Sequence, residues 1–220
     1  MTMMSSRNGD RLSAIALGTV ATLAVGWISL IPKAYAHHPT GAELPATFFQ
    51  GLLSGVGHPV IGLDHLAFVI ALGAIAAFSK QGFIAIAAFL ATGLLGTVLH
   101  LQSADLPLVE IAIAFSTLAF GILVVLRQSN LIAIATCAAI AGLFHGYAYG
   151  ESIIGAEPTP FIAYLIGFTA IQAAIAFAAR AYAKAVGERS GVGVGAPGAI
   201  VLGGIVTGVG LTFFAQSLGI

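Results

Sequence analysis

Charged side chains are scarce in this sequence. Only 7% of its 220 residues are Asp, Glu, Lys or Arg, whereas roughly a quarter of a soluble domain is charged. Hydrophobic residues make up 59%, and the mean hydropathy is +1.03. This composition excludes an ordinary water-soluble fold and predicts a polytopic protein of the lipid bilayer. Eight basic and eight acidic residues leave a formal net charge of zero. The sequence therefore lacks the excess of positive charge that is typical of nucleic-acid-binding proteins.

Cysteine is almost absent, since Cys137 is the one example. A single thiol excludes an intrachain disulfide framework and a thiolate-rich metal cage. The sequence also lacks the GxxxxGK[ST] phosphate loop, which excludes ATP hydrolysis by a P-loop mechanism. No resident cofactor is expected.

Residues 1–36 have the pattern of a secretory signal peptide. Arg7 and Arg11 precede an apolar run over residues 12–32, and Ala34-Tyr35-Ala36 follows as a small-x-small cleavage signal. The run is longer than the 7 to 15 residues usual for such a region, so an uncleaved anchor helix remains an alternative. Cleavage after Ala36 would leave His37 and His38 at an outward-facing terminus, where two imidazoles and an amine offer a first contact for a divalent cation.

The remaining residues, 37–220, are expected to form one all-α membrane domain. Six apolar segments are expected to cross the bilayer, at residues 62–79, 83–101, 106–126, 131–149, 161–183 and 196–218. All but the first, which needs Val60 and Ile61 to reach that length, are near the roughly 20 residues required. A shorter apolar stretch at residues 46–56 precedes them and is expected to form a re-entrant or outer-leaflet helix, interrupted by the GVGHP sequence.

The basic residues predict the orientation of these spans, because Lys and Arg concentrate in cytoplasmic loops. They occupy alternate connections, at Lys80, Arg127, Arg180, Lys184 and Arg189. The other connections carry acidic residues instead, at Asp105, Glu151 and Glu157. Both ends of the mature chain are therefore expected outside a bacterial inner membrane.

The stretch GHPVIGLDHLAF, residues 57–68, places polar groups in this apolar background. His58 and His65 are seven residues apart, so on one helix they would share a face. Asp64 is costly in lipid, by roughly 2.5–3.5 kcal/mol, which makes it a candidate functional residue. A helix beginning in which His58 merely lies among the headgroups is the alternative.

A second polar group ends the span over residues 131–149. There His145 adjoins a stripe of glycines, Gly142, Gly146 and Gly150, with the spacing that lets helices approach closely. Glu151 follows, and the predicted topology adds His100 and Glu110 at the same outer end. Imidazoles with carboxylates suit Zn, Ni, Co, Cu or Fe(II). A hydrogen bond between His145 and a neighbouring helix and a merely solvated Glu151 are the alternatives.

The two groups carry a family resemblance. His58, five residues and Asp64-His65 match an HX5DH motif, and the run FHGYAYGE over residues 144–151 matches FHGX[AV]XGE. Both motifs, in these spans, resemble the signatures of the HupE/UreJ family of nickel and cobalt permeases. The resemblance implies that the metal pathway includes His58, Asp64, His65, His145 and Glu151, with His37 or His38 as accessory ligands. His100 and Glu110 fall outside the motifs and rank lower.

The expected function is uptake of Ni2+ or Co2+, with the metal ion as substrate and not as cofactor. Two alternatives stay open on the residues alone: a non-transporting metal-binding subunit of a larger membrane complex, and a membrane-embedded metalloenzyme. The glycine-rich faces would suit a homo-oligomer or a complex partner. The scattered ligands and the lack of an evident general base beyond Glu110 or Glu151 favour a protein that is not an enzyme.

Overall fold

A computed structural model describes residues 44–190 and 196–220, and in them every regular element is an α-helix. The predicted signal peptide, His37 and His38 lie outside these residues. The helices are α2 (Phe48–Ile61), α3 (Leu63–Ala76), α4 (Phe83–Leu101), α5 (Val109–Val125), α6 (Leu131–Glu151), α7 (Pro158–Ser190) and α8 (Ala196–Ser217). The all-α prediction is confirmed for this part of the chain.

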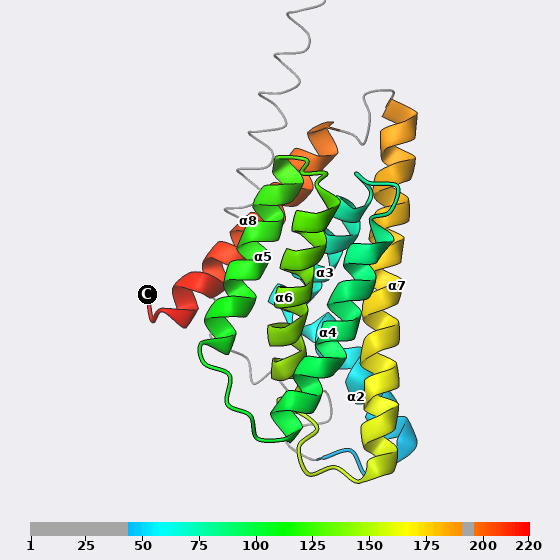
Figure 1. Cartoon of the computed structure of the whole chain (residues 1–220), viewed down its shortest axis with the longest axis vertical. Coiled ribbons are helices and arrows are strands. Elements are labelled where there is room, and N and C mark those ends of the chain that lie inside the picture. The colour runs from blue at the N-terminus through cyan, green and yellow to red at the C-terminus, as the bar shows by residue number, and fades with distance from the viewer. Residues whose placement is uncertain (1–43, 191–195) are drawn as a thin grey trace, which may run out of the picture.

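The helices pack as three pairs around a central one. The pairs are α4 with α6, α5 with α8, and α2 with α7, while α3 contacts members of all three (Figure 1). Glycines allow the two helices of a pair to approach each other closely. A Cβ on Gly146 of α6 would meet the Gly93 carbonyl of α4, and one on Gly51 of α2 would meet the Pro160 carbonyl of α7. The predicted role of the small-residue stripe in helix packing is confirmed at Gly146.

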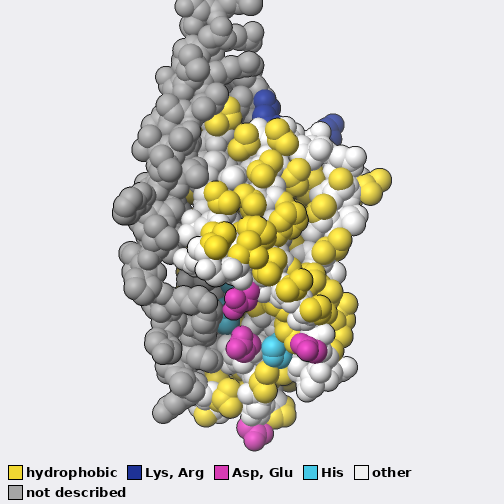
Figure 2. All heavy atoms as spheres, turned by 90° about the vertical axis from the view of Figure 1, so that its left-hand side faces the viewer, with side chains coloured by type: hydrophobic (Ala, Val, Ile, Leu, Met, Phe, Trp, Pro, Cys, Tyr) yellow, Lys and Arg dark blue, Asp and Glu magenta, His cyan; other side chains and the backbone are white. Residues whose placement is uncertain are grey.

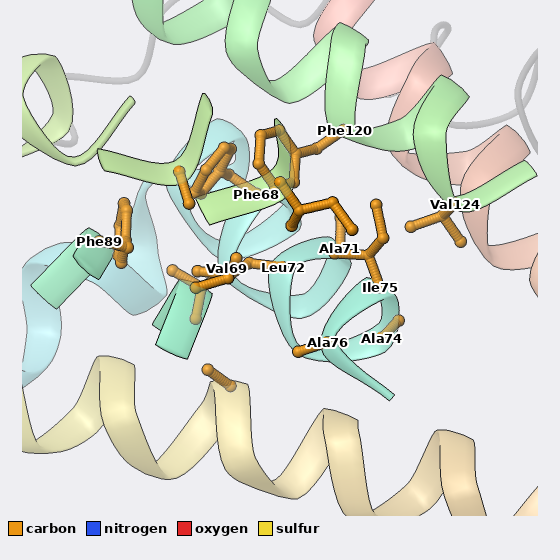
Figure 3. Packing of buried hydrophobic residues seen from close by; sticks show 14 of the residues in the cluster. Phe68, Val69, Ala71, Leu72, Ala74, Ile75, Ala76, Phe89, Phe120 and Val124 are labelled. Atoms are coloured by element: carbon orange, nitrogen blue, oxygen red, sulfur yellow. The ribbon is translucent and has the colours of Figure 1, made fainter. Parts of the chain in front are cut away.

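Helix α3 forms the centre of the core because, after Asp64 and His65 in its first turn, its sequence is apolar on every side. Phe68, Leu72 and Ile75 are fully buried, and Figure 3 shows them facing side chains from neighbouring helices, among them Phe89 of α4 and Phe120 of α5. The ring centroid of Phe68 lies 4.6 Å from that of Phe120 and 5.0 Å from that of Phe89. This packing holds the first turn of α3 inside the bundle.

Four helices of the described residues are long and apolar enough to cross a membrane: α4, α6, α7 and α8. Helices α2 and α3 pass the same test only as a pair, with a bend of 80° between them, and α5 is a shorter apolar helix. The prediction that GVGHP interrupts the short first helix is wrong. Helix α2 runs through Pro59 to Ile61, and the break comes at Gly62.

On the face that Figure 2 shows, Lys and Arg side chains lie toward one end of the bundle and Asp and Glu side chains toward the other. At the basic end, the Arg180 guanidinium reaches from α7 to the end of α3, where its Nε donates to the Ala76 carbonyl at 3.2 Å and an Nη to the Lys80 carbonyl at 3.1 Å. Arg127 lies over the Phe78 ring, 6.0 Å from its centroid. The loops that carry Lys80 and Arg127 therefore share one end of the molecule.

Replacing Arg180 with Met is expected to destabilise the bundle, because the Ala76 carbonyl at the end of α3 and the Lys80 carbonyl in the following loop lose their charged donor. A hydrogen bond to a charged group contributes about 1.5–3 kcal/mol to the free energy of unfolding. We therefore expect the Tm in detergent to fall by several degrees. Lys184→Met, one turn further along α7, removes the same charge and is the control. Equal Tm values for the two variants would contradict this role for Arg180.

Candidate metal site

The break between α2 and α3 builds the candidate site. Gly62 is extended, with φ −71° and ψ 102°, and its N–H still donates to the His58 carbonyl at 3.1 Å. A Cβ at Gly62 would lie 2.7 Å from Cδ2 of the His65 ring, so glycine leaves room for that imidazole. His58 thus lies in the last turn of α2 and His65 in the first turn of α3. The expectation that both share a face of a single helix is wrong, because the chain bends by 80° between them.

Three imidazoles meet at this break. His58, His65 and His145 are 7%, 6% and 0% exposed, respectively. Nδ1 of His65 lies 2.8 Å from Nδ1 of His145 on α6, and the His58 and His65 ring centroids are 6.1 Å apart. The structure therefore brings together histidines from both sequence motifs. They form a buried polar group within a largely apolar bundle.

Hydroxyl groups from neighbouring helices bind the outer sides of these rings. Ser116 Oγ of α5 lies 3.0 Å from Nε2 of His145. Ser152 Oγ, just after α6, lies 3.1 Å from Nδ1 of His58 and donates to the Tyr164 hydroxyl of α7 at 2.9 Å. Hydroxyls from α5, from the residue after α6 and from α7 thus hold the imidazoles in place.

Tyr149 packs its ring between two of the histidines. Its centroid lies 4.6 Å from that of His65 and 5.1 Å from that of His58. The side chain is fully buried, and its hydroxyl has no hydrogen-bond partner among the described residues. A buried phenol normally finds a partner, so this hydroxyl is an unsatisfied polar atom beside the imidazoles. Such an atom suits a site that receives a hydrated ion.

Asp64 lies in the first turn of α3 and is half-buried. Its Oδ1 accepts the backbone N–H of His65 at 2.9 Å, and its carbonyl accepts the Thr117 hydroxyl of α5 at 3.2 Å. An acidic residue at a helix N-terminus is stabilised by the helix dipole. The carboxylate is therefore held beside the histidine cluster, on the same helix as His65.

Three other predicted residues lie apart from these contacts. Glu110, in the first turn of α5, and Glu151, at the end of α6, are exposed. His100 is partly buried at the end of α4, where its ring packs against that of Tyr147 at a centroid distance of 4.2 Å. Its Nδ1 has no hydrogen-bond partner in the described part of the chain. The structure does not join them to the His58, His65 and His145 cluster.

Within residues 44–190 and 196–220, no three His, Cys, Asp or Glu side chains converge so that they could hold a metal ion. The coordinating role of the predicted residues thus stays a prediction. What the arrangement offers is a set of imidazoles with fixed orientation, an adjacent carboxylate and an unsatisfied phenol, all groups that bind divalent transition metals or their water ligands.

The sequence motifs missed the residues that surround the histidines. Ser116, Ser152 and Tyr164 carry hydroxyls that bond the rings or one another. Ser116 alone had a usable signal, as a hydroxyl within the apolar run IAIAFSTLAFGI. Ser152 follows α6 and Tyr164 lies in the second turn of α7, near helix ends where polar residues are common, so only the contacts that the end of α6 makes with α2 and α7 reveal them.

Comparison with known proteins supports one family. A family model described as HupE / UreJ protein matches residues 19–213. A protein named Protein HupE from Rhizobium leguminosarum bv. viciae is 32% identical over 126 residues, which cover 56% of this chain and 66% of that protein. The match therefore spans just under two thirds of that relative. No solved structure matches the chain.

Proposed function

Because the chain belongs to the HupE/UreJ family, a family of nickel and cobalt permeases rather than enzymes, we propose that it carries Ni2+ or Co2+ inward across the bacterial inner membrane. The ion is substrate, and it is selected at the break between α2 and α3. The residues that form this site are His58, Asp64, His65 and His145.

The observation that carries this proposal is the buried histidine cluster itself. Histidines inside a bundle of apolar helices are rare and mark substrate or ion pathways, and here three of them are buried together, with Nδ1 atoms of two of them 2.8 Å apart. Neutral imidazole and carboxylate are suitable ligands for Ni2+ and Co2+. The unsatisfied Tyr149 hydroxyl adds a group that can bond a water of the incoming ion.

We place six spans in the membrane. They are the bent α2 and α3 pair, the shorter α5, and the four longer helices. The basic end, with Lys80, Arg127 and Arg180, faces the cytoplasm by the positive-inside rule. The acidic end then faces outward, with both mature termini on that side. His37, His38, His100, Glu110 and Glu151 would collect cations there.

A membrane potential is sufficient to drive this uptake. A divalent ion that crosses 100 mV gains about 4.6 kcal/mol, which is roughly a thousandfold accumulation. Weak ligation toward the cytoplasmic end favours release, because conduction requires a site that the ion can leave.

Uptake in cells that express the full chain tests the proposal. We expect accumulation of 63Ni2+ or 57Co2+ above that of cells with empty vector, competition between these two ions, and weaker competition by Zn2+. Lack of accumulation of either ion would contradict a permease function.

Purified protein in liposomes separates transport from binding. A permease moves Co2+ into the vesicles with an inside-negative potential, and collapse of the potential slows it. Co2+ binding without flux would instead identify a metal-binding subunit that needs a partner.

A further inference from the structure

Two polar side chains of α7 lie between the histidine cluster and the basic end of the bundle. Resting on the proposed function, we propose that the amide oxygen of Gln172 and the hydroxyl of Thr169 form an exit site, which binds the ion after it leaves the histidines and before its release. Neutral oxygen ligands suit Ni2+ and Co2+ less well than imidazole does. The ion is therefore held at the exit site only weakly and can leave it.

Buried side-chain atoms without a hydrogen-bond partner gather around Phe168. The described residues contain four such nitrogen or oxygen atoms, and three of them belong to Tyr149, Thr169 and Gln172. The Phe168 ring centroid lies 5.4 Å from that of Tyr149. Thr169 follows Phe168 in the chain, and Gln172 lies one turn further along the same helix. Since nearly all buried polar groups are bonded, three exceptions in one region indicate a place that receives a polar ligand.

The amide of Gln172 has a fixed orientation. The side chain is 1% exposed, and its Nε2 donates to the Phe168 carbonyl at 3.0 Å. A carbonyl oxygen only accepts, so the amide nitrogen, and not the amide oxygen, must face it. Oε1 then has no hydrogen-bond partner in the described part of the chain. Gln172 therefore presents an oxygen acceptor inside the bundle.

Thr169 differs from the other threonines that lie well inside the helices. Five of these donate to the carbonyl four residues earlier: Thr92, Thr97, Thr117, Thr207 and Thr212. Thr169 makes no such bond to Leu165, and its Oγ1 is buried without a partner among the described residues. Residues three apart on a helix are neighbours, with Cβ atoms about 5–6 Å apart. Thr169 and Gln172 thus offer two oxygens within one turn of α7.

The position of Gln172 along α7 places the exit site on the basic side of the histidines. Helix α7 runs past α2 and α3 (Figure 1), and Gln172 lies about 6 Å beyond Phe168 along its axis. One turn further, the Ala176 carbonyl lies where a Cβ on Gly73 of α3 would be. After one more turn, Arg180 donates to the end of α3. An ion that moves from the histidines toward the basic end along α7 therefore passes Gln172.

Helix α3 supplies no ligand for this part of the path. Its sequence is apolar from Leu66 to its end, and Val69 and Leu72 are fully buried. A dication that moved from the histidines directly into such surroundings would lose its ligands in one step, which is costly. The oxygens on α7 divide this loss into two smaller steps. Conduction of this kind requires sites that bind the ion and also release it.

Gln172→Leu tests the exit site in the full-length protein. The variant keeps a side chain of similar size and removes the oxygen. We expect Vmax for Co2+ flux into liposomes to fall about tenfold per folded protein, because a polar contact to a charged group is lost. Co2+ affinity in detergent, measured from the d–d absorption, should stay within twofold, and Tm should not fall. Vmax within twofold of wild type would overturn the proposal.

Gln102→Leu is the matched control for this variant. Gln102 is exposed just after α4, so the same substitution removes an amide outside the bundle. We expect Vmax within twofold of wild type. If Gln102→Leu and Gln172→Leu slowed the flux equally, the loss would not come from the position of Gln172, and the exit site would be wrong.

Thr169 provides an independent test if Gln172→Leu fails to fold. Thr169→Val replaces the hydroxyl by a methyl group and is expected to lower Vmax about threefold, whereas Thr169→Ser keeps the hydroxyl and should stay within twofold of wild type. Thr212→Val is the matched control, because the Thr212 hydroxyl donates to the Gly208 carbonyl on α8. Equal Vmax values for Thr169→Val and Thr212→Val would overturn the role of Thr169.

Wild-type protein in the same liposomes separates this inference from the permease function. If wild type and Gln172→Leu carry Co2+ equally fast, the oxygens of α7 bind only structural water, and the permease function stands without the exit site. If wild type carries neither Co2+ nor Ni2+, the permease function is wrong, and the exit site with it.

Discussion

Asp64→Asn is expected to reduce Ni2+ and Co2+ uptake at least hundredfold, the largest effect of any single substitution. The variant removes the negative charge beside the histidine cluster and keeps an oxygen that can accept the His65 N–H, now bonded at 2.9 Å. The start of α3 should therefore be preserved while the attraction for a dication is lost. A hundredfold loss corresponds to about 2.7 kcal/mol. Initial uptake rates, normalised to protein in the membrane, measure it.

Asp105→Asn is the matched control for this prediction. Asp105 is exposed in the loop between α4 and α5, at the acidic end of the bundle, so the variant removes the same charge away from the cluster. We expect uptake within about twofold of wild type, because an exposed charge is screened by salt within about 10 Å. If Asp105→Asn and Asp64→Asn lost uptake equally, the effect would reflect surface charge and the site would be wrong.

Gly146→Ala is expected to have the largest effect on stability. The added methyl would meet the Gly93 carbonyl, so α4 and α6 must separate or bend. Overpacking of this kind costs about 1–3 kcal/mol, and each kcal/mol lowers Tm by about 2–4 °C in a chain of this size. We expect the Tm of purified protein in detergent to fall by about 5–10 °C. His145 precedes Gly146, so metal uptake should fall as well.

Gly198→Ala tests whether this effect comes from contact or from the loss of glycine. Among the described residues, nothing lies within 4 Å of a Cβ at Gly198 in the first turn of α8. Alanine favours helix over glycine by up to about 1 kcal/mol, so this variant should match or exceed the wild-type Tm. A Gly146→Ala protein as stable as Gly198→Ala would mean that the two helices tolerate the methyl group.

The helices themselves were largely predictable from the sequence. Residues 83–101 were predicted as one span and form α4 with the same bounds, and 131–149 falls within α6. These spans can be predicted because the length of an apolar run is read directly from the sequence. A helix in lipid also satisfies its backbone hydrogen bonds within its own segment, without neighbouring helices. The end of α7 was less predictable: the helix continues to Ser190, past the predicted 183, because Lys, Arg and Glu end a hydropathy pattern without ending a helix.

The arrangement of the site was not predictable in the same way. The sequence named His58, Asp64, His65 and His145 as candidates, since polar groups in apolar spans are conspicuous. It could not place the bend at Gly62, because proline and glycine both occur in GHPVIG and either could end a helix. The spacing argument therefore put His58 and His65 on one helix, where the fold has two.

By itself, the sequence determined that this is a helical membrane protein with basic and acidic connections in alternation and two motifs of the HupE/UreJ family. These are properties of composition and local spacing. Only the tertiary structure decided that the Nδ1 atoms of His65 and His145 lie 2.8 Å apart and that Ser116 and Ser152 bond the histidine rings. Such contacts join residues 29 to 94 positions apart, and they exist because glycines let the helix pairs approach closely while α3 packs between them.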